Sequence, residues 1–325
     1  MKIQHACRFG KYALALAMIA CFTTAEALDF LLPQANEILG FGSFLAQSEV
    51  WRSSFGDVPR SSIELGMPQA EIRAPASGAV VYIQRESPQF SSFFSFPLGN
   101  AIAIEHPEKY MSVIAGLGSF LSSAFEASSQ QISEVTRVPA GAIISRSAGS
   151  GVFPSNFFSV SLYDTNNALW INPIFFTPWV VDHSAPSIQS ITLARIGGVN
   201  SSPIELVPSR GSKETVISCL QGNYSIAVDA YDIITPTTNI HSAPYRFTSV
   251  LDGKTVLDTS FIGANRRENG LSFLGNQAPS LNAVTSEGLL KIGSIILPKG
   301  EHDLSVHISD YSGNTSSVKA RLLVR

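Results

Sequence analysis

Histidine is the side chain that most often holds catalytic zinc and moves protons near neutral pH, so its positions limit the chemistry open to this sequence. Of six histidines in 325 residues, those after residue 27 are His106, His183, His241, His302 and His307. None occurs from Leu28 to Glu105 or from Pro107 to Asp182. Catalytic zinc takes three protein ligands and keeps one position for water. His106 alone cannot supply that set, so we expect no catalytic zinc centre in the first half of the chain.

The other reactive groups do not form a catalytic set either. No Gly-x-Ser-x-Gly motif is present, and the glycines around Ser150 indicate a turn rather than a nucleophile. His302 is expected in a turn and His307 on the solvent side of an alternating strand, so both are interpreted as surface histidines. Cys219, surrounded by Val, Ile and Leu, is expected to be a small buried residue. The carboxylates Asp57, Glu64 and Glu71 are expected in solvated loops.

Composition narrows the class of protein. Hydrophobic residues make up 45% and charged residues 14%, which is typical of a folded chain rather than a disordered one. The net charge is −3 and no basic run is present, so a nucleic-acid partner is not expected. A length of 325 residues predicts two domains.

The first 27 residues have the pattern of a signal peptide. Lys2, Arg8 and Lys11 precede a short apolar stretch, 12–22, and Ala25-Glu26-Ala27 supplies small residues before a cleavage site. We expect export and a mature chain from Leu28. Cys21 lies in a stretch that loosely resembles a lipobox, so lipidation is an alternative, and it alone would bring the chain to a membrane.

Short apolar or alternating runs separated by Gly, Pro, Ser and Asn predict β-strands in the first half. A segment at 28–50 is expected to be helical or extended, and 119–136 to be a loop. The predicted strands are Ala79–Ile83, Ala101–Glu105, Met111–Ile114, Ala142–Ser145 and Phe158–Tyr163.

Prolines at 173, 178 and 186 predict a boundary between domains at 51–182 and 186–325. Asp252-Gly253 and Ser312-Gly313-Asn314 predict tight turns in the second half. An immunoglobulin-like β-sandwich is expected there. The predicted strands are Ile188–Ile196, Tyr224–Tyr231, Tyr245–Leu251, Lys291–Leu297, Leu304–Ile308 and Val318–Val324.

Five pieces between Trp51 and Trp179 occur in the order found in lysostaphin-type (LytM-type, duplicated hybrid motif) zinc endopeptidases, which cut peptide cross-bridges in peptidoglycan. They are Ile72–Val81 (IRAPASGAVV), Leu98–His106 (LGNAIAIEH), Val138–Ile144 (VPAGAII), Ser147–Gly151 (SAGSG) and Phe158–Pro173. The sequence therefore resembles this family, and its second half looks like the β-sandwich that follows the peptidase domain in some bacterial members. The resemblance implies an all-β fold with a lysostaphin-type antiparallel sheet followed by a sandwich.

The resemblance also marks the positions where active members carry their chemistry. Active members need a His and an Asp four residues apart plus a second His for zinc, and two more histidines for proton transfer. Here those positions hold Ser62, Gly66, Gly116, Phe157 and Ser159. A shift of the alignment by one or two residues brings in no histidine. The resemblance thus implies a degenerate member with no catalytic residue, no metal and no zinc cofactor.

The same resemblance suggests where such a protein would bind. Asn156 and Ser159 would lie in the former substrate groove and are binding candidates. A Phe-rich stretch either forms a contact surface or packs over the groove, and both readings stay open. Its residues are Phe90, Phe93, Phe94 and Phe96.

The function expected from the sequence is that of a non-catalytic protein of the periplasm or bacterial cell envelope, with outer-membrane association if it is lipidated. It would bind peptidoglycan or regulate a cell-wall hydrolase through the former groove. The alternative is a structural or adhesive envelope protein that uses the sandwich and the Phe-rich stretch. An active endopeptidase would need zinc ligands that the sequence does not supply.

Overall fold

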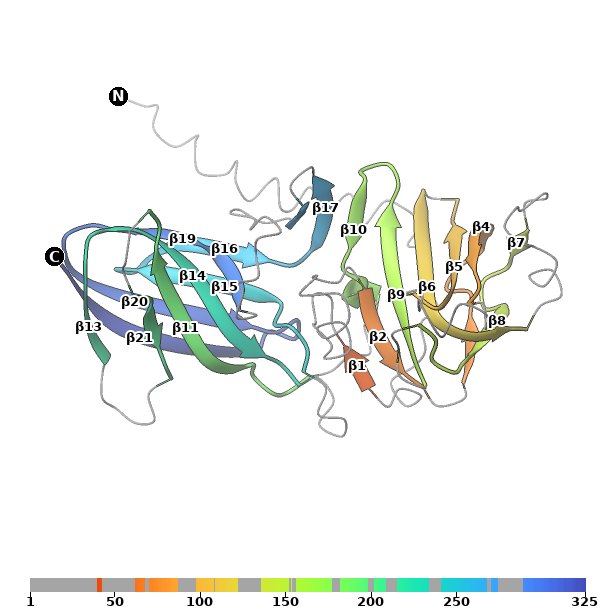
Figure 1. Ribbon diagram of the computed structural model, residues 1–325, viewed down its shortest axis with the longest axis horizontal. Coiled ribbons are helices and arrows are strands. Elements are labelled where there is room, and N and C mark those ends of the chain that lie inside the picture. Colours follow the sequence, from red (N-terminus) through yellow and green to blue (C-terminus); the bar gives the residue numbers. More distant parts are fainter. Residues whose placement is uncertain are drawn as a thin grey trace, which may run out of the picture.

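The computed structural model describes residues 40–42, 62–67, 70–86, 98–107, 109–121, 136–151, 153, 156–176, 182–197, 202–208, 215–233, 241–267, 270–273 and 289–325. These residues form β-strands and one short 3-10 helix, η2 (Pro173–Phe176), so the fold is all-β as predicted. Among them no helix is long and apolar enough to cross a membrane. Figure 1 shows two bodies along the long axis, a twisted sheet and a sandwich of two sheets.

The first sheet contains twelve strands, mostly from the first half of the chain. Its main path runs β18-β17-β10-β9-β6-β5-β4-β7, with β1, β2, β3 and β8 paired off that path, and the strand pairs are antiparallel. The strands of the first half are β1 (Gly40–Gly42), β2 (Ser62–Gly66), β3 (Glu71–Arg73), β4 (Gly78–Gln84), β5 (Asn100–Glu105), β6 (Tyr110–Phe120), β7 (Arg137–Val138), β8 (Ile143–Ser147), β9 (Phe157–Asp164) and β10 (Leu169–Ile171).

Alternation along these strands builds the core of the first sheet. In β2, Ile63 and Leu65 are fully buried on one face, while Ser62, Glu64 and Gly66 belong to the other face. Aliphatic residues from β4, β5, β6 and β9 join this core, together with Ile174 of η2. The core therefore lies on one side of the sheet and leaves the opposite face to carry other side chains.

The sandwich consists of a four-stranded sheet, β12-β11-β14-β19, and a five-stranded sheet, β13-β21-β20-β15-β16. One buried cluster draws residues from both sheets, including Ile226, Phe247 and Leu322. The strands are β11 (Ser187–Arg195), β12 (Ile204–Leu206), β13 (Thr215–Cys219), β14 (Gly222–Tyr231), β15 (Arg246–Leu251), β16 (Lys254–Ser260), β19 (Leu290–Leu297), β20 (Gly300–Ser309) and β21 (Thr315–Val324). The C-terminus lies at the end of the sandwich that is far from the first sheet (Figure 1).

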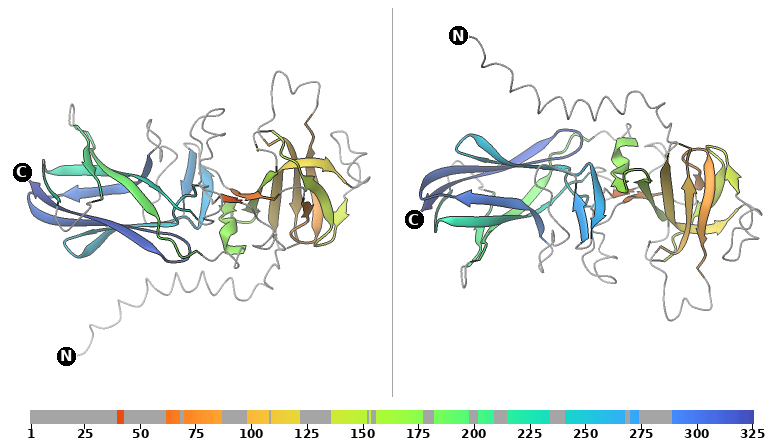
Figure 2. Two further views of the ribbon diagram at one scale, coloured as in Figure 1. Left: turned by 90° about the horizontal axis from the view of Figure 1, so that it is seen from below. Right: turned by 90° about the horizontal axis from the view of Figure 1, so that it is seen from above.

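One hairpin from the second half of the chain belongs to the first sheet. β17 (Gly263–Arg267) and β18 (Gly270–Phe273) follow β16, and β17 pairs with β10, so it extends the sheet at that edge. In Figure 2 this hairpin stands between the two bodies. The Asn172 side chain also donates to the carbonyl of Phe261 at 2.8 Å, which ties the start of η2 to the sandwich.

Three aromatic rings meet at the same junction. Phe175 of η2 lies 5.6 Å from Tyr311 and 6.3 Å from Tyr245, with the rings edge to face, and the two tyrosines are 5.4 Å apart. Such pairs add to the free energy gained by burying the rings. The two bodies are therefore joined by packing and by a shared sheet, in addition to the chain that connects them.

Every strand predicted from sequence is present, and the turns at Asp252-Gly253 and Gly313 are formed with positive φ angles. Several predictions were wrong. Glu64 and Glu71 lie within strands rather than loops, and residues 119 and 120 end β6. The strand Gly40–Gly42 lies in the segment that was expected to be helical or extended. His302 is the third residue of β20, not part of a turn. The signal peptide with Cys21, most of the segment 28–50, Asp57 and residues 122–135 lie outside the described residues.

Candidate functional site

The positions singled out by the family resemblance lie on neighbouring strands of the first sheet. Gly66 of β2 pairs with Phe157 of β9, and Ser159 of β9 pairs with Glu64 on one side and Ala115 of β6 on the other. Residues that pair across strands point to the same face. That face, formed by β2, β9 and β6, is here called the groove face. It carries hydroxyls, glycines and a phenyl ring where a zinc centre would need imidazoles.

Gly116 of β6 follows the last residue of that strand that pairs with β9, and an aromatic ring lies against it. It is the extra residue in the irregular pairing of β5 with β6, and its φ of 77° favours glycine. A Cβ atom built on Gly116 would lie 2.8 Å from the ring of Phe153 and 3.0 Å from the carbonyl oxygen of Phe157. Phe153 is 8% exposed and packs on Ala101 and Ala115. A side chain at Gly116 would therefore have to displace the ring.

The binding candidates differ in how much surface they offer. Asn156 is half-buried at the start of β9, has a φ of 77°, and its carbonyl accepts a hydrogen bond from the amide of Met67 at 2.7 Å. Ser159 is only 4% exposed and Ser62 only 9% exposed. Asn156 is thus the more accessible of the two candidates. The Phe-rich stretch of Phe90, Phe93, Phe94 and Phe96 lies outside the described residues.

The glycine turn around Ser150 is locked to the edge of the groove face. The Ser150 hydroxyl donates to the carbonyl of Leu117 at 2.7 Å and accepts from the amide of Asn100 at 2.8 Å. A Cβ on Gly99 would lie 2.3 Å from the Ser150 Oγ, so glycine is required for this approach. Ser150 therefore holds a turn in place, which agrees with the interpretation from sequence.

His106 has a structural environment at the end of β5. It is 2% exposed, its Nδ1 lies 2.9 Å from the carbonyl oxygen of Ser77 and its Nε2 lies 3.0 Å from the hydroxyl of Ser112. Because a carbonyl only accepts, Nδ1 donates to Ser77, while the hydroxyl of Ser112 can pair with Nε2 as donor or acceptor. Both ring nitrogens are occupied by protein groups.

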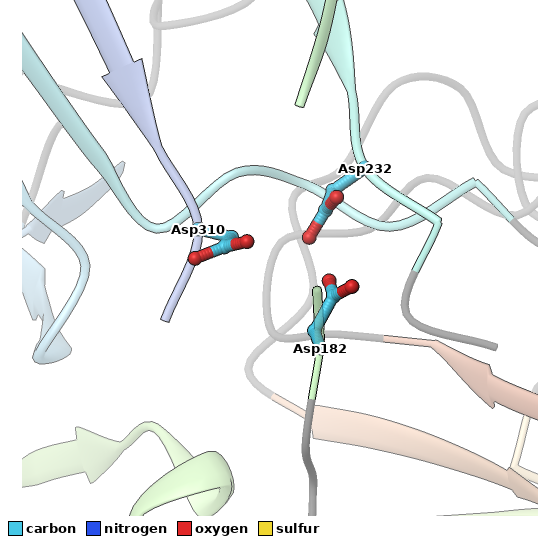
Figure 3. A group of neighbouring side chains, drawn as sticks. All are labelled: Asp182, Asp232 and Asp310. Atoms are coloured by element: carbon cyan, nitrogen blue, oxygen red, sulfur yellow. The ribbon is translucent and has the colours of Figure 1, made fainter. Parts of the chain in front are cut away.

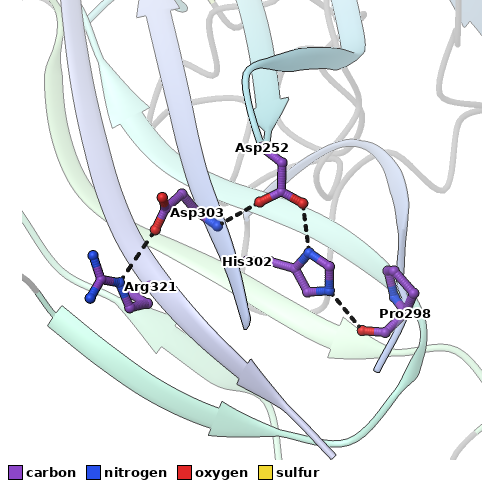
Figure 4. Close-up of polar contacts among 5 residues, drawn as sticks. All are labelled: Asp252, Pro298, His302, Asp303 and Arg321. Atoms are coloured by element: carbon purple, nitrogen blue, oxygen red, sulfur yellow. Dashed lines mark hydrogen bonds and ion pairs between the residues drawn. The ribbon is translucent and has the colours of Figure 1, made fainter. Parts of the chain in front are cut away.

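His302 is a partly enclosed ion-pair partner rather than a surface histidine. Its side chain is 12% exposed, with Nδ1 2.6 Å from the carboxylate of Asp252 and Nε2 3.0 Å from the carbonyl of Pro298 (Figure 4). Both partners are acceptors, so the ring carries two protons. The hydrogen bond to Asp252 raises the pKa of His302, and the same bond lowers the pKa of Asp252. Asp252 also accepts from the amide of Asp303, so the pair closes the ends of two neighbouring strands.

A second group of polar side chains was not identified from the sequence. Asp182 precedes the sandwich, Asp232 directly follows β14, and Asp310 directly follows β20. One oxygen from each carboxylate lies within 4.8 Å of the others (Figure 3). The three residues are only 7%, 2% and 4% exposed. We call this group the acidic cluster, and it lies at the end of the sandwich that faces η2.

Hydrogen bonds hold each member of the acidic cluster in place without neutralising it. Asp182 Oδ1 accepts from the amide of Ser184, and Asp232 Oδ1 accepts from the amide of Ile233. Asp310 accepts from the backbone and side-chain nitrogens of Asn314. In the part of the chain that the structure describes, Asp182 Oδ2 is buried and accepts no hydrogen bond from an amide or hydroxyl. Within the described residues no lysine or arginine forms an ion pair with any of the three.

The clustering has electrostatic consequences. Burial raises the pKa of Asp232 to about 7, and the neighbouring carboxylates of Asp182 and Asp310 add to the shift. Burial also raises the pKa of Asp310, against the lowering effect of its hydrogen bonds from Asn314. Removing carboxylates from water and placing them together both disfavour the charged form. The only sequence signal was that each aspartate sits at the end of a predicted strand or at the predicted boundary.

Comparisons with known proteins found partial similarities. A protein-family model whose description states no function matches residues 185–325, less than half of the chain. No curated protein matches. Similar solved structures include the catalytic domain of the antimicrobial peptidase lysostaphin from Staphylococcus simulans, at 15% identity and a TM-score of 0.31, covering 42% of this chain and 90% of that chain. Full-length lysostaphin aligns at 12% identity and a TM-score of 0.32, covering 90% of this chain and 91% of that one. A chain of the SpoIIQ–SpoIIIAH pore-forming complex aligns at 13% identity and a TM-score of 0.32, covering 47% and 92%.

Proposed function

We propose that the chain is an exported, non-catalytic protein of the bacterial cell envelope that binds peptidoglycan peptides, or a hydrolase that acts on them, through its groove face. The observation that carries the proposal is the composition of that face. The five positions at which active lysostaphin-type enzymes carry ligands and proton-transfer groups lie on or beside three neighbouring strands, and none holds an imidazole or a carboxylate.

The packing around Gly116, the position that the resemblance aligns with a histidine of active members, also supports the loss of catalysis. The Phe153 ring lies against the glycine, so a histidine side chain has no room at this point of the face. Hydrolysis by the family route needs a histidine close to the zinc-bound water. The groove face is therefore built to pack and to bind rather than to activate water.

Asn156 is the accessible polar side chain that would form hydrogen bonds with a bound peptide. Its left-handed backbone presents it next to β2 and β9, and an amide both donates and accepts hydrogen bonds. Peptide ligands offer complementary amide groups along their backbone. This chemistry suits a cross-bridge peptide or an extended segment of a partner protein.

Co-sedimentation with purified peptidoglycan sacculi, with zinc content read on the same sample, tests the proposal. We expect specific pelleting without stoichiometric zinc. Asn156→Gly keeps the left-handed backbone while it removes the amide, and it should weaken pelleting several-fold. Asn166→Gly, at the other end of β9, is the matched control and should pellet like the parent chain. Stoichiometric zinc would contradict the proposal directly.

A second candidate follows from the burial of Phe153. Because that ring fills part of the groove face, the working surface would lie elsewhere, as in a structural or adhesive envelope protein. This candidate predicts that Asn156→Gly and Asn166→Gly pellet alike, or that the parent chain does not pellet at all. The same experiment thus separates the two functions.

A further inference from the structure

The acidic cluster is separate from the groove face and has no part in the proposed function. Its carboxylates come from three segments far apart in the sequence, and the fold brings them together at the junction. All three are more than nine-tenths buried. Burying a charge without a partner is costly, and burying three like charges side by side is more so. The arrangement needs compensation, either by a bound cation or by a proton held between the carboxylates.

One oxygen of Asp182 points to where a cation would sit. Asp182 Oδ2 is buried and, among the described residues, accepts no hydrogen bond from an amide or hydroxyl, and the carboxylate is directed toward Asp232 and Asp310 (Figure 3). The other oxygen of Asp182 and one oxygen of Asp232 are held by backbone amides. Backbone donors thus orient these two carboxylates while each keeps an oxygen turned inward.

We propose that the acidic cluster is a calcium site in which Asp182, Asp232 and Asp310 each supply a carboxylate oxygen. Calcium prefers oxygen ligands at about 2.3–2.6 Å, so two ligands of one ion lie up to about 5 Å apart. The spacing within 4.8 Å suits this ion. Carbonyl and water oxygens would complete the six to eight ligands that calcium takes. The described residues place no cysteine or histidine in the cluster, which disfavours zinc.

The site would fasten the segment between the two bodies onto the sandwich. Asp182 is already attached there through its backbone, because its amide donates to the Ser312 hydroxyl and its carbonyl accepts from the Asn314 side chain. Tyr311, next to Asp310, packs on Phe175 of η2. An ion shared by Asp182 and Asp310 would therefore stiffen the joint as well as stabilise the sandwich.

The site is tested by titrating the purified, EGTA-treated chain with calcium chloride in a calorimeter and by measuring its Tm. We expect one calcium per chain with a Kd of about 0.1–1 mM, the range of extracellular modules. In 10 mM calcium chloride the Tm should rise by about 5 °C. Asp182→Asn should abolish both the binding and the rise, whereas Asp229→Asn, exposed on β14, should leave both intact.

A shared proton between Asp182 and Asp232 is the competing explanation. It predicts no calcium binding and a higher Tm in EGTA for either Asp182→Asn or Asp232→Asn, because each substitution removes a buried charge. That result would overturn the proposal. Equal affinity for magnesium chloride, or tighter binding of zinc chloride, would overturn the assignment to calcium. The Asp232→Asn variant guards against a folding defect specific to position 182.

Discussion

The groove face and the acidic cluster differ in the side chains that they bury. On the groove face, positions that would carry charge in an active enzyme hold glycine, serine and phenylalanine, and Phe153 is packed over them. In the acidic cluster, three carboxylates are buried at the end of a sandwich, and one oxygen among them accepts no hydrogen bond from an amide or hydroxyl of the described residues. At those positions the groove face carries small or packed side chains, with Glu64 as a half-buried carboxylate beside them, whereas the acidic cluster has a feature that costs folding free energy.

This difference indicates where to look for function in a chain that resembles an enzyme. Apolar packing stabilises the fold without further explanation, so the groove face needs no ligand to exist. Buried like charges are destabilising unless something compensates them. The acidic cluster, whose burial costs folding free energy, is therefore the better guide to a bound ion. The family resemblance directs attention to the groove face instead.

The largest expected effect concerns the packing of Phe153 on the groove face. Phe153→Ala should lower the free energy of unfolding by about 2–4 kcal/mol, because it removes a nearly buried ring from contact with Ala101 and Ala115. Urea unfolding measures the change. Tyr82→Ala, which removes a ring that is 51% exposed on β4, should cost much less.

Replacing Gly116 with histidine tests whether the Phe153 ring fills the space next to this glycine. Gly116→His should cost about 2–4 kcal/mol in unfolding free energy, because a side chain is strained at a φ of 77° and meets the Phe153 ring. In the Phe153→Ala background the cost should be smaller by 1 kcal/mol or more, a coupling of the kind seen between residues in contact. Additive effects in this double-mutant cycle would show that the ring does not occupy the space of the histidine.

The junction next to the acidic cluster is expected to show a moderate effect. Phe175→Ala removes the ring that packs on Tyr245 and Tyr311, and should lower the unfolding free energy by about 1–2 kcal/mol. Calorimetry should show the unfolding of the first sheet and the sandwich becoming less coupled. A single, unchanged transition would mean that the shared strands alone join the two bodies.

The smallest effect concerns the partly enclosed ion pair of His302 and Asp252. The raised pKa of His302 gives stability that is complete below about pH 6.5 and is lost as the pH rises through the folded-state value. The lowered pKa of Asp252 gives stability that is complete above about pH 3.9 and is lost as the pH falls through its folded-state value. Both contributions are present between about pH 4 and 6.5.

His302→Gln should therefore lower the unfolding free energy by about 0.5–1 kcal/mol at pH 5.5 and by less at pH 9, since half of the Asp252 side chain is exposed and screened by solvent. Urea unfolding at the two pH values measures the difference. His307→Gln on the same strand is the control. The same loss at both pH values would assign the effect of His302 to packing instead of charge.

The strands were predictable where local pattern and turn chemistry agreed. Tyr224, Ile226 and Val228 alternate toward the core as their spacing required, and Asp252-Gly253 forms the hairpin turn that it predicts. By contrast, Ser62–Gly66 is short and half polar, and it is a strand because β9 pairs with it. Glu64, in the middle of this strand, was misplaced in a loop for the same reason.

Residues of the two sites could be predicted from the sequence only where the family motifs marked them. The resemblance named Gly116 but gave no sign of Phe153, because the contact is made through a turn whose path depends on Gly99 and Ser150. The acidic cluster could not be predicted from spacing, since Asp182, Asp232 and Asp310 meet only when the two sheets of the sandwich close. No metal was expected from the sequence because His106 is the lone histidine between Leu28 and Asp182, whereas the acidic cluster consists of aspartates.

The hairpin formed by β17 and β18 has a consequence for dissecting this molecule. A chain truncated before residue 183 would keep β10 but lose its partner β17, which would leave the backbone groups of Leu169, Trp170 and Ile171 open to water. Open strand edges recruit strands from other molecules. The truncated first sheet would therefore tend to self-associate through β10, and adding a peptide of residues 263–273 in trans would cap that edge and keep it monomeric.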